Sequence, residues 1–362
     1  MSNDTPMNPP PPSEEQIFQA AAALPPHERG TYLDAACGDR LDLRARLERL
    51  LASREASGFM DAPPISPDIE AELARLKPEE AGERIGPYKL LQQIGEGGFG
   101  VVWMAEQEQP VRRRVALKII KMGMDTKEVI ARFEQERQAL AMMEHPNIAK
   151  VFDAGATQYG RPFFVMELVR GVKITDYCDQ QELPTAERLA LFIHVCQAVQ
   201  HAHQKGIIHR DLKPSNILVT INDGEPVPKV IDFGVAKATQ GRLTDATLFT
   251  QFEQMVGTPL YMSPEQAELT SLDIDTRSDI YSLGVLLYEL LTGRTPIDTA
   301  TMAQAGMDEI RRIIREVDPP RPSARVKTFD GAEMTTAAKR RHTDAAKLPS
   351  ALRGDLDWIV MK

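Results

Sequence analysis

Hydrophobic residues change their spacing along the chain near Tyr88, and the two spacings predict two kinds of structure. Across residues 13–57 the apolar positions recur three or four apart, as in amphipathic helices. Pro25 and Pro26 interrupt that pattern, because a proline inside a helix removes a backbone hydrogen bond. We therefore expect two or three short helices here, then a proline-rich linker with one short helix near Asp68–Leu76.

From Tyr88 onward, short runs rich in β-branched and aromatic residues alternate with turns, which predicts antiparallel strands. The runs are YKLLQQIGEGGFGVVWMAEQ, RRRVALKIIKM, AKVFDAGA and RPFFVMELV. One helix is expected between the second and third runs, over Lys127–Glu144. After Gly171 the pattern is mainly helical, so we expect an α+β fold with a small β-rich lobe followed by a larger α-helical lobe.

These patterns divide the chain into five predicted segments. They are a disordered proline-rich tail (1–12), a small helical N-terminal region (13–58), a linker (59–87), a small lobe (88–170) and a large lobe (171–362).

The strongest apolar run, Leu283–Leu291, is far shorter than the roughly 20 residues that span a bilayer. The N-terminus also lacks the basic start and apolar core of a signal peptide, so we expect a cytoplasmic protein.

Charge and cysteine content narrow the classes of partner. The formal net charge of −9 disfavours binding to a nucleic-acid backbone or an anionic membrane surface, so neither partner is expected. Cys37, Cys178 and Cys196 lie far apart and form no CxxC pair, which argues against a disulfide framework or a zinc site. His201 and His203 are two apart on a predicted helix and face different ways, which argues against a metal site.

A glycine-rich motif lies in the first strand-like run. Residues 95–102 fit the pattern GxGxxGxV, in which glycines let backbone amides approach phosphate oxygens without a Cβ clash. Dinucleotide sites share GxGxxG, but they need a helix directly after the glycines, whereas VVWMAEQ continues as a strand. We therefore expect a phosphate-covering loop between two strands.

Lys118 stands in the middle of an apolar strand, VALK, where a charged side chain is costly to bury without partners. Nucleotide phosphates and a carboxylate would be such partners. On the predicted helix that follows, Glu136 is our first choice for the carboxylate, and Glu134 is the alternative. The charged residues of that helix could equally form a solvated face.

The string HRDLKPSN at residues 209–216 is the most specific in the chain. It has the character of a loop that carries a general base (Asp211), a cation near a phosphate (Lys213) and a metal ligand (Asn216). Asp232, in the string DFG, follows after a predicted strand–turn–strand. Its carboxylate suits Mg²⁺, a hard cation that prefers oxygen ligands and substrate phosphates.

Taken in order, these motifs resemble the eukaryotic-type (Hanks-type) protein kinase family, over about residues 88–362. IIHRDLKPSNILV and GTPLYMSPEQA look like the bacterial serine/threonine branch, and IRRIIREVDPPRPSARV and LRGDLDWIVMK resemble kinases common in planctomycetes and related bacteria. The resemblance implies a bilobal kinase fold, ATP and Mg²⁺ as cofactors, and transfer of the γ-phosphate to serine or threonine hydroxyls of proteins.

Carried over residue by residue, the resemblance assigns the catalytic roles. Lys118 pairs with Glu136 and holds the α- and β-phosphates, and Asp211 accepts the proton of the substrate hydroxyl. Asn216 and Asp232 bind Mg²⁺. The residues implied to contact ATP besides Lys118 are Ile94, Gly95, Glu96, Gly97, Gly98, Phe99, Gly100, Val102, Ala116, Met166, Glu167, Val169 and Leu218.

Within that set, the resemblance makes Met166 the gatekeeper of the adenine pocket, with the backbones of Glu167 and Val169 at the adenine edge. The implied sandwich of the ring is Val102, Ala116 and Leu218, and the implied apolar spine is Leu140, Val151, His209 and Phe233. Each of these residues could also be ordinary core.

Substrate class rests on two further features. Lys213, two residues after the base, is the serine/threonine form of the loop, and Thr258 before SPE is implied to bond Asp211. Ser263 departs from the alanine usual at its position, and Asp279 is expected to anchor the catalytic-loop backbone. A complete domain of this family would continue past Lys362 and supply an arginine to Glu265, so the large lobe is expected to be incomplete here.

Regulation is implied by Arg210, which in this family commonly receives a phosphate on the activation segment. Of the candidates Thr239, Thr244, Thr247 and Thr250, the distance before GTP favours autophosphorylation at Thr250 and Thr247. Loop threonines without a role are the alternative. Dimerisation, with self-phosphorylation in trans, would fit the same mechanism.

Other functions remain open at this stage. A catalytically silent kinase-fold scaffold or signalling adaptor is one alternative, and it would normally lack Lys118, Asp211, Asn216 or Asp232, all of which are present. A small-molecule phosphotransferase is another, and it usually lacks a segment such as GTPLYMSPE. The N-terminal helices could be an interaction module or could pack on the small lobe.

Overall fold

The computed structural model describes residues 14–38, 40–56, 79–97, 100–120, 143–233, 259–267 and 275–362. The chain divides into two compact units, residues 1–77 and 78–362. The helix predicted near Asp68–Leu76, and nearly all of the one predicted over Lys127–Glu144, lie outside the described residues.

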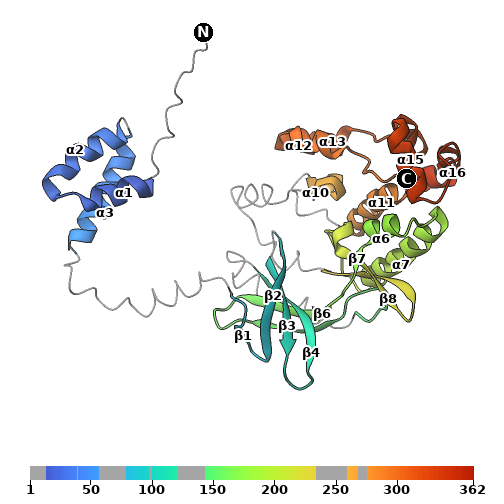
Figure 1. The fold of residues 1–362 in the computed structure, drawn as a ribbon, viewed down its shortest axis with the longest axis horizontal. Helices are drawn as coiled ribbons and strands as arrows, with labels where there is room; N and C mark the ends of the chain where they lie inside the picture. Colours follow the sequence, from blue (N-terminus) through green and yellow to red (C-terminus); the bar gives the residue numbers. More distant parts are fainter. Residues whose placement is uncertain are drawn as a thin grey trace, which may run out of the picture. The chain divides into compact units, whose positions relative to one another are not determined.

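The first unit contains three short helices, as the spacing of apolar residues predicted (Figure 1). They are α1 (Glu14–Ala23), α2 (Pro26–Cys37) and α3 (Leu41–Ala56). Pro26 is the first residue of α2, a position whose backbone N–H has no partner within the helix in any case. The helices bury a shared core, made of Ile17, Ala21, Leu33, Cys37, Leu47 and Leu51.

The small lobe of the second unit is a six-stranded antiparallel sheet with the order β1-β2-β3-β4-β6-β5 (Figure 1). Its strands are β1 (Arg84–Ile85), β2 (Tyr88–Gly97), β3 (Gly100–Gln107), β4 (Arg113–Ile120), β5 (Val151–Ala156) and β6 (Pro162–Glu167). The four predicted strand-like runs are therefore all found as strands.

Alternation along β4 gives the sheet two different apolar faces. Leu117 and its neighbours two residues away belong to a core confined to the small lobe. Ala116 and Ile120 belong to a second core that continues into the large lobe. Because successive side chains of a strand point to opposite faces, Lys118 lies on the same face as Ala116 and Ile120. The pleat thus directs this lysine toward the large lobe.

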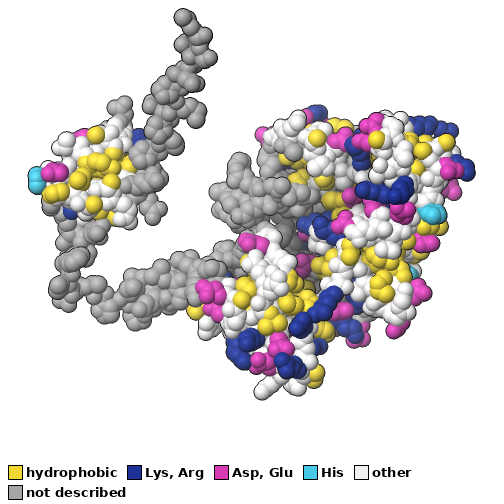
Figure 2. Space-filling model, in the orientation of Figure 1, with side chains coloured by type: hydrophobic (Ala, Val, Ile, Leu, Met, Phe, Trp, Pro, Cys, Tyr) yellow, Lys and Arg dark blue, Asp and Glu magenta, His cyan; other side chains and the backbone are white. Residues whose placement is uncertain are grey.

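Arg112 lies in the turn between β3 and β4, and Arg113 and Arg114 are the first two residues of β4. Dark blue and magenta side chains mix over the small lobe in Figure 2. Arg112 forms an ion pair with Glu106 at 3.0 Å. The guanidinium of Arg113 stacks 3.7 Å from the ring centroid of Phe152 and donates to Gln107 at 2.7 Å. Arg112 and Arg113 therefore both have partners for their guanidinium groups within the small lobe.

The large lobe combines a three-stranded sheet with helices (Figure 1). The sheet is β7 (Val172–Lys173), β8 (Ile217–Asn222) and β9 (Glu225–Val230). The helices of eight or more residues are α7 (Thr185–Gln204), α11 (Thr276–Thr292), α13 (Met307–Glu316) and α15 (Gly331–Arg340). Shorter helices are α6 (Ile174–Gln180), α10 (Pro264–Ala267), α12 (Thr299–Gln304), α14 (Pro322–Arg325), α16 (Leu348–Leu352) and α17 (Asp355–Met361).

The central helix α11 is buried over most of its length. Its N-cap is Asp275, whose side chain accepts the backbone N–H of Arg277, and its C-cap is Gly293, which has φ 85°. A Cβ at Gly293 would lie 3.2 Å from the guanidinium of Arg341, so the glycine also leaves room for that side chain. Within the part of the chain that the structure describes, no helix is both long and apolar enough to cross a bilayer.

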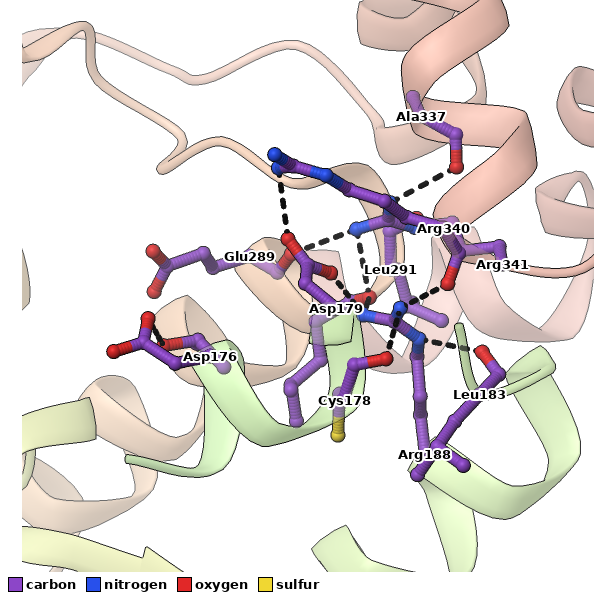
Figure 3. A network of polar contacts seen from close by, with 12 residues as sticks. Asp176, Cys178, Asp179, Leu183, Arg188, Glu289, Leu291, Ala337, Arg340 and Arg341 are labelled. Atoms are coloured by element: carbon purple, nitrogen blue, oxygen red, sulfur yellow. Dashed lines mark hydrogen bonds and ion pairs between the residues drawn. The ribbon is translucent and has the colours of Figure 1, made fainter. Parts of the chain in front are cut away.

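Two buried arginines hold the C-terminal end of α11 (Figure 3). Arg188 of α7 bonds the Asp179 carboxylate at 2.8 Å and the carbonyl of Leu290 at 3.3 Å. Arg341, after α15, donates to the carbonyls of Leu290 at 3.0 Å and Ala337 at 3.1 Å. Burial, together with the positive charge of Arg188, lowers the pKa of Arg341 to about 10. The network joins α6, α7, α11 and α15.

Candidate active site

Asp279 of α11 binds the backbone of the loop at residues 209–216, and its side chain is fully buried. The Asp279 carboxylate accepts the backbone N–H groups of His209 at 2.8 Å and Arg210 at 2.7 Å. A ring nitrogen of His203 lies 2.7 Å from the same carboxylate. Asp279 thus contacts the loop backbone as the sequence predicted.

The electrostatics of Asp279 follow from these contacts. Burial by itself would raise the pKa of this carboxyl, because it disfavours the charged form. The hydrogen bond with His203, the interaction with His209 and the backbone bonds of the loop outweigh burial and hold the pKa of Asp279 below its usual range. The anchor of the loop is therefore an ionised carboxylate at neutral pH.

Two predicted site residues contact Asp211. The Lys213 ammonium lies 2.8 Å from Oδ2 of Asp211. The side-chain amide of Asn216 donates to the same oxygen at 3.1 Å and to the Asp211 carbonyl oxygen at 2.7 Å. Two donors from one loop therefore fix the direction of the Asp211 carboxylate, and its side chain remains partly exposed.

Lys118 reaches across from the small lobe to Asp232, with 3.0 Å between its Nζ and Oδ2. Asp232 follows β9 and has φ 63°, a left-handed conformation that turns the backbone at this point. The backbone N–H of Ile231, one residue earlier, donates to the carbonyl of Asn216 at 2.9 Å. The structure therefore brings the backbone just before Asp232 against that of Asn216, and the side chains of both residues carry oxygen atoms suited to a metal ion.

His209 and Phe233, the residue after Asp232, form an aromatic contact. The rings of His209 and Phe233 are 4.7 Å apart between centroids, and a His209 ring nitrogen is 2.9 Å from the carbonyl oxygen of Ile231. Phe233 and Val151 line one small cavity. The other lining residues of that cavity are Met143, Ala149, Phe164, Met166 and Asp232. Three of the four predicted spine residues thus lie in one neighbourhood, and Leu140 lies outside the described residues.

The residues predicted around adenine come from several strands. Val102 of β3 packs on the core cluster that contains Ala116 and Met166, which face each other across β4 and β6. Glu167 ends β6 and forms an ion pair with Lys229 at 2.8 Å. Leu218 is half-buried on β8 and pairs in register with Lys173 of β7.

The glycine-rich segment forms the end of β2 and the start of β3. Gly95 pairs with Val102 and Gly97 with Gly100 across the two strands, and Ile94 is 47% exposed beside them. A Cβ at Gly100 would collide with the carbonyl oxygen of Ile119, so this glycine is required by the neighbouring strand. The predicted site residues that lie outside the described residues are Gly98, Phe99, Glu136, Thr247, Thr250 and Thr258.

Polar contacts that the sequence did not predict link residues 261–266 to the catalytic loop and to α11. The side-chain amide of Gln266 donates to the carbonyl of Arg210 at 2.7 Å. The hydroxyl of Tyr261 bonds the carboxylate of Glu289, whose pKa burial and the charges of neighbouring aspartates raise. The Ser278 hydroxyl donates to Glu265 at 2.6 Å. The only signal in the sequence was the string GTPLYMSPEQA, which contains Gln266 but gave no reason to select that residue.

Comparisons with known proteins place this geometry in a family. The model of the family described as "Protein kinase domain" matches residues 88–346. Serine/threonine-protein kinase Pkn1 of Myxococcus xanthus is 35% identical over 292 residues, which are 80% of this chain and 39% of the relative. Serine/threonine-protein kinase PknB of Mycobacterium leprae is 35% identical over 243 residues, 66% of this chain and 37% of the relative. The chain thus spans about two fifths of the length of these relatives.

Among solved structures, the PknI kinase domain of Mycobacterium tuberculosis superposes on this chain with a TM-score of 0.52 and 24% identity. The match covers 78% of this chain and all of that domain. The second unit therefore has the protein kinase fold, with a curled small-lobe sheet and a helical large lobe.

Proposed function

Because the chain belongs to the protein kinase domain family, we propose that it transfers the γ-phosphate of ATP to serine and threonine hydroxyls of proteins, its own included. The main support is that Lys213 and Asn216 both contact Asp211 within one loop, and that Lys118 forms an ion pair with Asp232. The names of the curated relatives, which are serine/threonine-protein kinases, support the same substrate class.

In this proposal Asp211 orients the substrate hydroxyl and accepts its proton, because its carboxylate is held in one direction by Lys213 and Asn216. Lys213 lies close enough to offset negative charge that develops on the transferred phosphate. Lys118, buried on β4, holds the α- and β-phosphates, with Glu136 as its expected carboxylate partner.

Asn216 and Asp232 are the residues that would hold Mg²⁺. The side-chain amide nitrogen of Asn216 bonds Asp211, which leaves the amide oxygen as the donor atom for a metal. Asp232 follows Ile231, whose backbone N–H donates to the Asn216 carbonyl, and the Asp232 side chain is partly exposed. When bound, Mg²⁺ neutralises charge on the phosphates.

The nucleotide pocket that we propose is bounded by β2, β3, β4, β6 and β8. Val102, Ala116 and Leu218 would enclose adenine, with Met166 as gatekeeper and the Glu167 and Val169 backbones at its edge. The apolar packing of Val102 and Ala116 next to Met166 supports this pocket. The glycine segment with Ile94 would cover the phosphates.

The remaining proposals concern regulation and organisation. Thr250 and Thr247 would be autophosphorylated, their phosphates pairing with Arg210, and Thr258 would bond Asp211. Residues 13–58 would form a separate helical region joined by a linker to the lobes at 88–170 and 171–362. Dimerisation, and placement in the planctomycete-like branch, are proposed on the sequence resemblance alone.

A phosphotransfer assay tests the central proposal. The chain would be incubated with ATP, Mg²⁺ and a generic basic protein, alongside Asp211→Asn and Lys118→Met. The matched controls are Asp223→Asn and Lys327→Met, which change exposed residues of the same kind. Phosphate on serine or threonine that is lost only in the first two variants is the expected result.

Two other outcomes would contradict the proposal. Transfer that survives both substitutions would remove Asp211 and Lys118 from the mechanism. ATP binding without any transfer by the wild-type chain would favour a kinase-fold scaffold.

A further inference from the structure

The side-chain amide of Gln266 connects two parts of the site that lie far apart in the sequence. Its nitrogen donates to the carbonyl of Arg210 at 2.7 Å. Its oxygen accepts the backbone N–H of Ser263 at 3.0 Å and the Ser263 hydroxyl at 3.1 Å. Because donor and acceptor atoms of the amide are both used, only one orientation of the Gln266 side chain satisfies all three contacts.

The carbonyl that Gln266 holds belongs to a constrained stretch of backbone. Arg210 has φ 68°, in the left-handed region that non-glycine residues seldom adopt. Asp279 accepts the N–H of Arg210, and Gln266 donates to its carbonyl, both at 2.7 Å. The peptide groups on both sides of this residue are therefore held from outside the loop.

The second of these peptide groups is the one that leads into Asp211. Its carbonyl bonds Gln266, and its N–H, which belongs to Asp211, points to a ring nitrogen of His209 at 3.3 Å. Fixing this plane fixes where the Asp211 side chain begins. A small rotation here would move the carboxylate relative to Lys213 and Asn216, and misplacement by about 1 Å can cost as much as 100-fold in rate.

The other end of the Gln266 contact is Ser263, which is completely buried. Ser263 follows Pro259–Tyr261 and precedes α10, in the segment where a substrate peptide is expected to bind. Its hydroxyl would be absent if the usual alanine stood here, so the serine and the glutamine form one polar unit in this chain.

We propose that Gln266 is a positioning residue that ties the Arg210–Asp211 peptide of the catalytic loop to Ser263 of the peptide-binding segment. The proposal rests on the proposed kinase function. It assigns to the glutamine of SPEQ a role in aligning the base, and it makes that alignment depend on the segment being in place.

The decisive variant is Gln266→Glu, which keeps the shape and the acceptor but replaces the donor nitrogen with an oxygen. At pH 7.5 the introduced carboxylate would face the carbonyl oxygen of Arg210, and we expect kcat to fall about tenfold or more while the KM for ATP stays within about twofold. At lower pH the introduced carboxyl gains a proton and again donates. The ratio of variant to wild-type kcat should therefore rise from pH 7.5 to pH 5.5.

Two further variants separate this mechanism from simple loss of packing. Gln266→Met also lacks the donor but cannot regain one, so its kcat ratio should be low and independent of pH. Gln200→Glu introduces a carboxyl at an exposed site on α7 and should match wild type throughout. A kcat for Gln266→Glu within about twofold of wild type at pH 7.5, or a ratio that stays flat with pH, would overturn the proposal.

Hydrogen–deuterium exchange gives a readout that does not depend on activity. In Gln266→Met the peptide covering residues 207–213 should exchange about tenfold faster than in wild type, because its backbone loses an outside bond. Unchanged exchange overturns the positioning role. Inactive wild-type protein with altered exchange would instead count against the kinase function and leave the structural link standing.

Discussion

The ammonium group of Lys118 lies 3.0 Å from the carboxylate of Asp232, so a residue of the small-lobe sheet meets a residue that follows β9 of the large lobe. Both side chains are largely buried. Each charge therefore depends on the other, or on a ligand of the right sign, to offset the cost of leaving water.

This pairing leads to a prediction about metal dependence. Asp232→Asn removes the charge of one proposed ligand, so the Mg²⁺ concentration for half-maximal activity should rise at least about tenfold. A Mg²⁺ titration of phosphotransfer measures it, with Asp223→Asn as the control on an exposed turn. An unchanged Mg²⁺ requirement would show that Asp232 is not a ligand.

Asp279 should matter for both rate and acid stability. Asp279→Asn weakens the bonds to the His209 and Arg210 amides, and we expect kcat to fall about 100-fold as the loop shifts. Because the pKa of Asp279 is held below its unfolded value, its stabilisation is present above about pH 4 and is lost as pH falls through the folded pKa.

Urea unfolding at pH 3 to 7 tests the predicted loss of stability at acid pH. Wild type should lose more stability than Asp279→Asn as the pH falls below about 4, since only wild type has the carboxylate to protonate. Parallel stability curves for the two proteins would contradict this account of Asp279.

Arg341 should be a large single contributor to the stability of the second unit. Arg341→Met leaves the carbonyls of Leu290 and Ala337 without this donor in a buried place, at a cost of about 3 kcal/mol or more. Denaturant unfolding gives the value. Arg353→Met, at an exposed position, should change stability by less than about 0.5 kcal/mol, and equal effects of the two would refute the assignment.

Gly97 and Gly100, two of the glycines of the β2–β3 segment, should respond differently to substitution by alanine. A Cβ at Gly100 would collide with the Ile119 carbonyl, so Gly100→Ala should destabilise the second unit by about 1–3 kcal/mol. No described atom lies within 4 Å of a Cβ placed at Gly97, so Gly97→Ala should be close to neutral for stability. Thermal unfolding of both variants tests this difference. Equal melting temperatures for the two variants would contradict the prediction.

Much of the fold could be predicted because its signals are local. The four strand-like runs and the helices of residues 14–56 follow from apolar spacing, and Pro26 marks a helix start by the same logic. The prediction that Asp279 holds the loop backbone also agrees with the structure. The planctomycete-like branch and the site residues outside the described ranges stay predictions.

By itself, the sequence determined which chemical groups the site contains. Lys118, Asp211, Asn216 and Asp232 could be proposed from the sequence because the proposed phosphotransfer needs a lysine for the phosphates, a base and oxygen ligands for a metal. Only the tertiary structure decided their partners. Arg188, Arg341 and Gln266 looked like ordinary helix or loop residues, and their roles appeared once distant carbonyl groups were brought within hydrogen-bonding distance. A hydrogen bond between distant elements forms only where donor and acceptor lie about 2.7–3.2 Å apart, and residue spacing along one chain carries no such information.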